Sequence, residues 1–144
     1  MPIYKTKNKN FFKKWTPEMA YVLGFFAADG SMIKNKRILC TGGAGSIGQE
    51  IVRQLAPQNK IFILDINETG AFDLREELKW KGYWVHSRTG DIRDKETLED
   101  VFSDFKPQIV FHCAALKHVT PNDEYPEEAI QTNIIGTNNL IKEA

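Results

Sequence analysis

The sequence predicts an α/β fold with a doubly wound, mostly parallel sheet, and three observations support this. From residue 37 onward, short apolar runs alternate with longer segments of helical period, the pattern of parallel strands joined by crossover helices. The first run leads directly into glycines at positions 42, 45 and 48. The second run ends at an acidic residue, Asp65, about 20 residues after the glycines, which is a spacing typical of a dinucleotide-binding fold.

We expect four strands, at residues 37–41, 60–65, 83–88 and 108–114, because these runs are rich in Ile, Val, Phe and Tyr. The first helix begins near Ser46 and stops before Pro57. The second covers residues 69–81 and ends at Gly82, since glycine commonly terminates helices. A third covers residues 95–105, and the last runs from Pro126, a favoured first-turn residue, to Ala144. Right-handed crossovers then predict the strand order 3-2-1-4 of a truncated Rossmann-like sheet.

The glycine-rich turn after the first strand predicts a nucleotide phosphate site. Gly42 permits the tight turn, Gly45 lets a pyrophosphate approach the backbone, and Gly48 lets the helix pack closely on the sheet. The N–H groups at the start of the helix favour an anion. A glycine pattern alone also fits a purely structural turn, so the interpretation depends on the rest of the chain.

Asp65 supports the nucleotide interpretation and favours NAD over NADP. A carboxylate accepts hydrogen bonds from both ribose hydroxyls but repels a 2′-phosphate, and no Arg or Lys lies in residues 66–74 to attract one. The alternative is that Asp65 is a helix N-cap.

Composition predicts one compact domain over residues 36–144, preceded by a basic arm and helix in residues 1–35. The net charge of zero gives the whole molecule no reason to favour nucleic acid or an anionic membrane. The lysines at positions 5, 7, 9, 13 and 14 make the arm basic, which fits a solvated tail or a nucleic-acid contact.

Cys40 and Cys113 lie in apolar runs without metal-ligand spacing, so we expect small buried residues and no metal site. The apolar run at residues 19–28 is too short to cross a bilayer. With no recognisable signal peptide, the sequence predicts a cytoplasmic protein without a membrane partner.

Residues 36–144 resemble the extended short-chain dehydrogenase/reductase superfamily, whose Thr-Gly-x-x-Gly-x-x-Gly fingerprint is met at residues 41–48. Residues 90–94 resemble that family's adenine-binding turn, in which Asp91 would reach the adenine amine and Ile92 would pack on the ring. The resemblance implies a dinucleotide-binding set of Thr41, Gly42, Gly45, Ser46, Ile47, Gly48, Asp65, Asp91, Ile92, Ala114, Ala115 and Lys117.

Residues 111–119, 126–129 and 132–137 are similar to the branch of polysaccharide-biosynthesis nucleotide-sugar dehydratases and epimerases. One departure is Thr120, where that branch usually has proline. Its members oxidise a sugar hydroxyl with bound NAD or NADP, using a Tyr followed four positions later by a Lys. No tyrosine here has that partner. We therefore expect a cofactor-binding half with no catalytic residue, which meets a nucleotide sugar only if the other half is supplied. Its open sheet edge or its N-terminal helix would allow homo-oligomers.

Lys117 and His118 follow the fourth strand, where open parallel sheets bind ligands, and the resemblance implies that they line the cleft; a solvated loop is the alternative. His112 reads as a satisfied core histidine. Asn133 belongs either to a cleft-facing helix or to an exposed one.

Residues 15–31 resemble a LAGLIDADG homing-endonuclease helix, with identity at Gly24, Ala28, Asp29 and Gly30. The resemblance implies that Asp29 would bind a divalent metal. The alternative function is then a DNA-binding remnant of such an endonuclease fused to a dehydratase fragment, because one carboxylate and one helix cannot form a nuclease site. A native amphipathic extension that covers the sheet would also fit.

Overall fold

The computed structural model describes residues 33–117 and 124–144. In chain order these residues form β1 (Arg37–Thr41), α2 (Ser46–Leu55), the 3₁₀ helix η1 (Ala56–Gln58), β2 (Lys60–Asp65), α3 (Glu68–Trp80), β3 (Val85–Thr89), α4 (Lys95–Phe105), β4 (Ile109–His112), α6 (Pro126–Ile130), the π-helix η2 (Gln131–Gly136) and α7 (Thr137–Glu143). The expected N-terminal helix and basic arm lie outside the described residues.

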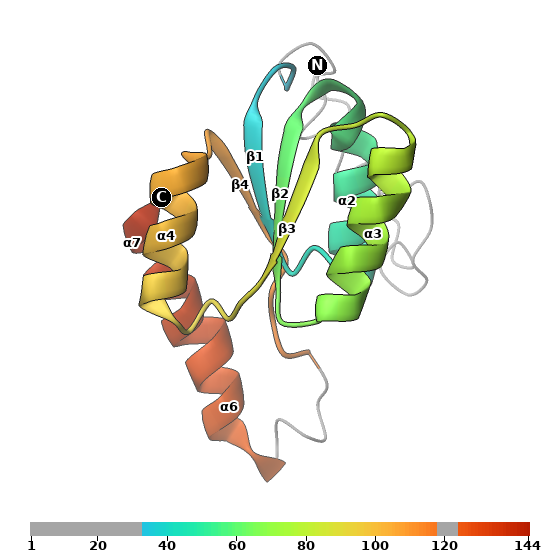
Figure 1. The fold of residues 1–144 in the computed structure, drawn as a ribbon. Helices are drawn as coiled ribbons and strands as arrows, with labels where there is room; N and C mark the ends of the chain where they lie inside the picture. The colour runs from blue at the N-terminus through green and yellow to red at the C-terminus, as the bar shows by residue number, and fades with distance from the viewer. Residues whose placement is uncertain (1–32, 118–123) are drawn as a thin grey trace, which may run out of the picture.

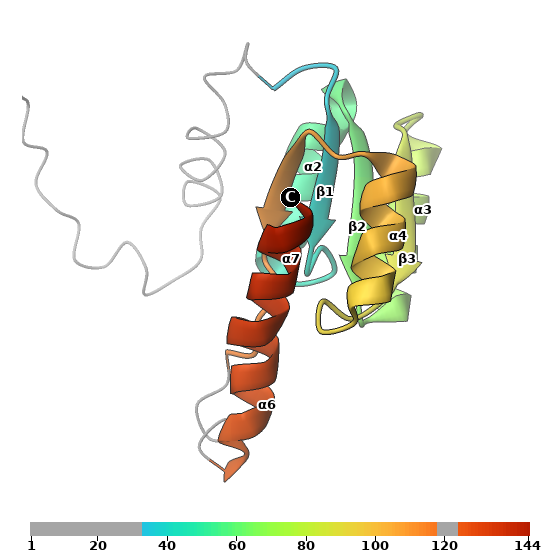
Figure 2. The same ribbon diagram turned by 90° about the vertical axis from the view of Figure 1, so that its left-hand side faces the viewer.

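The four strands form one parallel sheet in the order β3-β2-β1-β4, which confirms the predicted topology. In the central strand, Ile38 pairs with Ile61 of β2 on one side and with Ile109 of β4 on the other. Helices α2 and α3 cover one face, and α4 and α7 cover the other (Figures 1 and 2). The result is a three-layer arrangement around β1 and β2.

Two apolar clusters fill the spaces between the layers. The cluster beneath α2 and α3 contains Ile38, Ile61 and Ile63 from the sheet with Val52 and Leu78 from the helices. The opposite cluster contains Leu39, Leu64, Ile92, Leu98, Val101 and Leu140. Side chains of this size each stabilise the fold by about 1.5–3 kcal/mol when fully buried, so alternate residues of β1 hold both layers to the sheet. The free thiol of Cys40 is buried in the first cluster, and that of Cys113 is partly buried beside it.

The third strand begins two residues later than the predicted residues 83–88. The amide of Gly82 donates to Lys79 O and that of Tyr83 to Leu78 O, at 2.9 and 3.1 Å, and Gly82 has φ +82°. These bonds form the Schellman motif that closes α3, so Tyr83 still belongs to the helix end. The predicted glycine terminator is confirmed, and the strand start is corrected.

The fourth strand is shorter than the predicted residues 108–114, because its only partner in the described sheet ends first. Thr41, the last residue of β1, pairs with His112. Gly42 then turns away with φ +69°, which leaves Cys113 one further bond, from its amide to Thr41 O at 2.8 Å.

The last helix is interrupted where a single helix to residue 144 was predicted. The Thr137 amide donates a hydrogen bond to Ile134 O. The Thr137 hydroxyl donates one to the carbonyl oxygen of Asn133, at 2.8 Å. A side chain that replaces the backbone donor in this way distorts a helix. The π-helical turn follows from this local competition, and such turns are frequent at functional sites.

Candidate functional site

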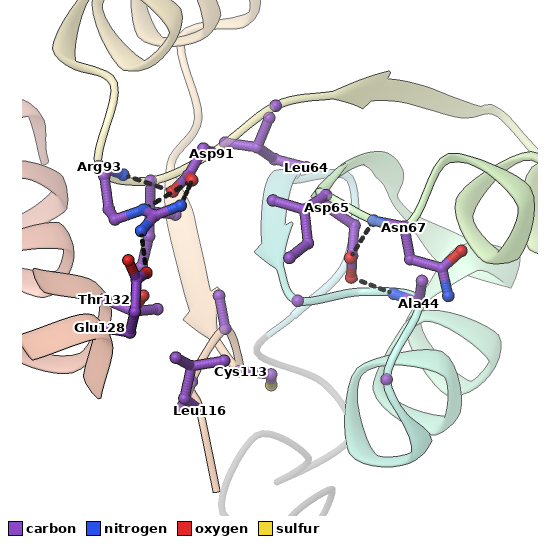
Figure 3. Close-up of a pocket in the computed structure, with 17 residues that line it drawn as sticks. Ala44, Leu64, Asp65, Asn67, Asp91, Arg93, Cys113, Leu116, Glu128 and Thr132 are labelled. Atoms are coloured by element: carbon purple, nitrogen blue, oxygen red, sulfur yellow. Dashed lines mark hydrogen bonds and ion pairs between the residues drawn. The ribbon is translucent and has the colours of Figure 1, made fainter. Parts of the chain in front are cut away.

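A pocket of about 420 Å³ lies where the carboxyl ends of the four strands meet (Figure 3). This is within the size range of ligand sites, and ligands of open α/β sheets bind at this edge. One side, the glycine-loop wall, consists of Gly42, Ala44, Gly45, Asp65 and Asn67. The opposite side, the turn wall, consists of Gly90, Asp91, Ile92, Arg93, Glu128 and Thr132. Leu64, Ile66, Cys113, Ala114, Ala115 and Leu116 complete the lining.

Two of the three fingerprint glycines are required by packing. At Gly42, φ is +69° and a Cβ would overlap the backbone of Cys113 and Ala114. At Gly48, a Cβ would overlap the carbonyl of Gly42. These contacts bring the glycine loop against β4 and the first turn of α2, so any side chain at either position would push the loop away.

Gly45 differs from both. It is exposed and lines the pocket, and it has the extended conformation φ −73°, ψ 163°, which every residue type adopts. Among the described residues, the one atom within 4 Å of an added Cβ would be Gly42 O, at 3.3 Å, a tight contact that a shift of a few tenths of an ångström relieves. The fold therefore makes little demand for glycine at this position, and what a side chain would occupy is open pocket space.

The Asp65 carboxylate binds the glycine loop to the end of β2. Its Oδ2 accepts a hydrogen bond from the Ala44 amide at 2.8 Å, and its Oδ1 accepts from the Asn67 amide at 2.9 Å. The N-cap of α3 is Asn67, whose side chain accepts from the Gly70 amide. The alternative of Asp65 as the helix cap is therefore wrong.

The start of α2 lacks the negative groups found at α3 and α4. Those helices have side-chain caps, Asn67 and Asp94, and an acidic residue in the first turn. Helix α2 has Gly45 at the N-cap, no side-chain cap bond and no acidic residue in its first turn. Its terminal N–H groups and partial positive charge are thus left for an anion from the pocket side.

On the turn wall, Asp91 forms a compact ion pair with Arg93. The Arg93 amide donates to Oδ1 at 2.9 Å, and its guanidinium donates to Oδ2 at 2.7 Å through Nε. The same guanidinium reaches Glu128 of α6 at 2.7 Å. Partial burial alone would raise the pKa of Asp91, but the hydrogen bonds and charge of Arg93 lower the pKa below its ordinary value. Asp91 is therefore an ionised acceptor at neutral pH.

A chain of hydrogen bonds runs from β1 through β4 to the last helix. His112 Nδ1 lies 2.7 Å from the buried Thr41 hydroxyl, and Nε2 lies 2.9 Å from the Thr137 hydroxyl. Because Thr137 donates to Asn133 O, it must accept from Nε2–H, and the ring then accepts from Thr41. Burial lowers the pKa of His112, which favours this neutral form. The ring is satisfied as predicted, but it lies half-exposed at the end of the strand, not in the core.

Asn133 continues this chain to the loop after β4. Its Oδ1 accepts from the Leu116 amide at 2.8 Å, and its Nδ2 donates to Leu116 O at 2.9 Å. Both polar atoms of the Asn133 amide are thus paired with the backbone of a residue that lines the pocket. Of the two locations predicted for Asn133, the structure shows the cleft-facing helix.

The structure brings together seven of the residues predicted from the sequence: Gly42, Gly45, Asp65, Asp91, Ile92, Ala114 and Ala115. Thr41 and Gly48 are buried behind them, and Ser46, Ile47 and Lys117 are exposed outside the lining. His118 lies outside the described residues. The sequence interpretation missed Arg93, Glu128 and Thr132; only the acidic first turn after Pro126 hinted at a charged partner for the turn wall.

Comparison with known proteins identifies the family. Residues 38–144 match the model described as polysaccharide biosynthesis protein. An uncharacterized membrane protein of Methanocaldococcus jannaschii is 48% identical over 113 residues, which is 77% of this chain and 33% of that protein. The inverting UDP-N-acetylglucosamine 4,6-dehydratase of Campylobacter jejuni is 36% identical over 115 residues, 76% of this chain and 33% of that enzyme. The probable polysaccharide biosynthesis protein EpsC of Bacillus subtilis is 36% identical, over 78% of this chain and 20% of that protein.

Solved structures agree with the Rossmann-like fold. Pen from Bacillus thuringiensis matches with a TM-score of 0.72 and 34% identity, over 78% of this chain and 35% of that one. The UDP-glucose 4-epimerase of Thermus thermophilus, in complex with NAD, matches with a TM-score of 0.63 and 38% identity, over 74% and 33%. The chain thus spans between a fifth and about a third of the length of these relatives. No helix in the described residues is long and apolar enough to cross a membrane.

Proposed function

Because the chain belongs to the polysaccharide biosynthesis protein family through residues 38–144, we propose that it binds a nicotinamide dinucleotide as part of a nucleotide-sugar dehydratase or epimerase. The relatives that are named for an activity act on UDP- or dTDP-linked sugars, and the epimerase structure from Thermus thermophilus holds NAD. The proposal carries that ligand class to the pocket at the ends of the strands.

The observation that carries the proposal is Gly45. The fold needs glycine at positions 42 and 48, whereas position 45 has ordinary backbone angles, little packing and an exposed place in the pocket. A ligand that approaches the backbone closely is the reason that remains for excluding a side chain there. The start of α2 beside it favours the negative charge of a pyrophosphate.

Asp65 supports NAD in preference to NADP. Each carboxylate oxygen accepts one backbone amide, and a carboxylate has further lone pairs for the ribose hydroxyls. A 2′-phosphate would meet this negative charge at close range. On the turn wall, Asp91 and Ile92 offer a charged acceptor and an apolar surface, which suit the amine and the ring of adenine.

When bound, the dinucleotide would supply hydride transfer: a hydride from the carbon that carries a sugar hydroxyl, and its later return to the sugar. The residues of this chain bind and orient that group. We assign no catalytic residue, because no tyrosine of the sequence has a lysine four positions later.

Thermal unfolding of the wild type, Gly45→Ala and Gly82→Ala with and without NAD tests the proposal. NAD at 100 times its Kd should raise the free energy of unfolding of the wild type by about 2.7 kcal/mol, and NADP should raise it less. Gly45→Ala should keep nearly the wild-type midpoint without ligand and lose the response to NAD. Gly82→Ala, a matched change at φ +82° with an open surrounding, should lower the midpoint and keep the response.

An unresponsive wild type would refute the proposal, and so would a Gly45→Ala variant that responds like the wild type. A larger response to NADP than to NAD would refute the role given to Asp65.

For the N-terminal segment, we propose nothing beyond the sequence resemblance. Residues 15–31 precede the family match, which begins at Ile38, and lie outside the described residues. The LAGLIDADG interpretation, with its DNA-binding alternative, stays a prediction, as does the cytoplasmic location.

A further inference from the structure

Asn139 is a buried polar residue that does not line the pocket. It lies on α7 with 3% of its surface exposed, next in sequence to Leu140 of the cluster between the sheet and α4 and α7. Its Nδ2 donates to two backbone carbonyls, that of Arg93 at 3.2 Å and that of Ile92 at 3.5 Å. A buried amide is costly unless it is hydrogen-bonded. Asn139 follows Arg93 by 46 positions and Ile92 by 47, so these bonds are a specific feature of the fold.

The two carbonyls belong to the turn that carries the acceptor of the turn wall. Inside this turn the Asp94 amide donates to Asp91 O at 3.0 Å, and the Arg93 amide donates to the Asp91 carboxylate. These bonds set the direction of the Asp91 side chain within the turn. They leave the carbonyls of the next two residues directed at α7, where Asn139 binds both.

A second contact fixes the same turn from the same helix. Ile92 is 4% exposed and lines the pocket. A Cβ at Gly136 would lie 2.7 and 2.8 Å from Cγ1 and Cδ1 of Ile92, so the helix reaches Ile92 closely because residue 136 has no side chain. The last helix therefore holds the turn in two ways: the side-chain amide of Asn139 binds the backbone of the turn, and the helix at Gly136 packs closely on the Ile92 side chain.

We propose that Asn139 is a positioning residue that determines base selectivity: through the carbonyls of Ile92 and Arg93 it fixes Asp91 and Ile92 where they recognise adenine. This inference rests on the proposed dinucleotide binding and deepens it. The turn alone sets the direction of the Asp91 carboxylate relative to its own backbone, while Asn139 sets the turn relative to the sheet and the glycine loop.

Calorimetric titration with NAD and with nicotinamide hypoxanthine dinucleotide tests the inference. Hypoxanthine carries an oxygen in place of the adenine amine, so it offers an acceptor to the Asp91 carboxylate. A hydrogen bond to a charged group gives about tenfold discrimination or more, and the wild type should prefer NAD by this factor. In Asn139→Asp, a carboxylate faces two carbonyls, the turn shifts, and the preference should fall below about threefold.

Asn138→Asp is the matched control, since it makes the same change at the exposed neighbouring position of the same helix. It should keep the wild-type preference. If Asn139→Asp does not fold, as judged by circular dichroism, Gly136→Ala displaces the same turn through Ile92 and should also reduce the preference.

The inference would be overturned if folded Asn139→Asp or Gly136→Ala preferred NAD over the hypoxanthine dinucleotide by the same factor as the wild type. Dinucleotide binding itself would then stand. A wild type that binds both dinucleotides equally would overturn it as well. A wild type that binds neither would instead refute the proposed function on which it rests.

Discussion

The two walls of the pocket are held in different ways. The glycine-loop wall is built from backbone contacts, such as the bond from the Gly42 amide to Leu64 O at 2.9 Å, and from backbone amides bound by Asp65. The turn wall depends on side chains from distant segments: Glu128, 35 residues after Arg93, and Asn139, 46 residues after it. One wall tolerates a single residue type at its critical positions, whereas the other depends on pairs of side chains.

This difference explains why single positions in the sequence mark the glycine-loop wall, whereas on the turn wall Asp91 and Ile92 were predicted without the side chains that hold them. A backbone that passes within contact distance of another admits only glycine, so the requirement is visible at each position separately. An ion pair or a buried amide can be formed by several residue types at many positions, and nothing local in the sequence marks the partner.

The largest expected effect breaks the glycine-loop wall. Gly42→Ala adds a Cβ that overlaps the backbone of Cys113 and Ala114 and also places alanine at φ +69°. The new Cβ would collide with backbone atoms, and no flexible side chain is involved that could move away. We expect the free energy of unfolding to fall by about 4 kcal/mol or more, measured by urea denaturation.

The matched control separates the clash from the backbone angle. Gly82→Ala places alanine at φ +82° with no atom of the described residues within 4 Å of the new Cβ, so it should cost only about 1–2 kcal/mol. Similar losses for the two variants would mean that the contact between the glycine loop and β4 is not what demands glycine.

The same contrast decides how much of the fold the sequence predicted. The bounds of β1, β2 and α4 agree with the structure, because apolar runs and capping residues are local signals. The start of β3 was misplaced, since Tyr83 is apolar enough for a strand while its amide closes α3. The π-helical turn was missed although its cause is local, because a helical threonine bonds to the carbonyl four residues earlier in some helices and not in others, so Thr137 alone does not mark the distortion.

A smaller effect tests the turn wall through the pair of Arg93 and Glu128. Urea unfolding of the wild type, Arg93→Met, Glu128→Gln and the double variant gives their coupling energy. Both side chains are more than a third exposed, at 39% and 58%. We therefore expect a coupling of about 0.5–1 kcal/mol that decreases in about 1 M salt, where the Debye length is roughly 3 Å. A coupling that salt leaves unchanged would contradict an electrostatic tie between the turn and α6.

The smallest effect concerns charges behind the glycine-loop wall, at Glu77 of α3. Hydrogen bonds from Arg53 and Lys81 lower the pKa of Glu77 to about 2 from its ordinary 4.5. A lowered pKa in the folded state gives stability that is present above pH 4.5 and is lost as pH falls toward 2. Because the side chain is 36% exposed, solvent screens the pair, and Glu77→Gln should cost only about 0.5 kcal/mol at neutral pH.

The difference in unfolding free energy between Glu77→Gln and the wild type should therefore shrink between pH 4.5 and 2, as urea titrations across that interval would measure. A difference that stays constant would mean that the ionised carboxylate contributes nothing. Glu77 does not line the pocket, so the variant should bind NAD as the wild type does. The ion pair of Arg53 and Glu77 then joins α2 to α3 outside the pocket. On the turn wall, by contrast, the ion pair of Asp91 and Arg93 lines the pocket itself.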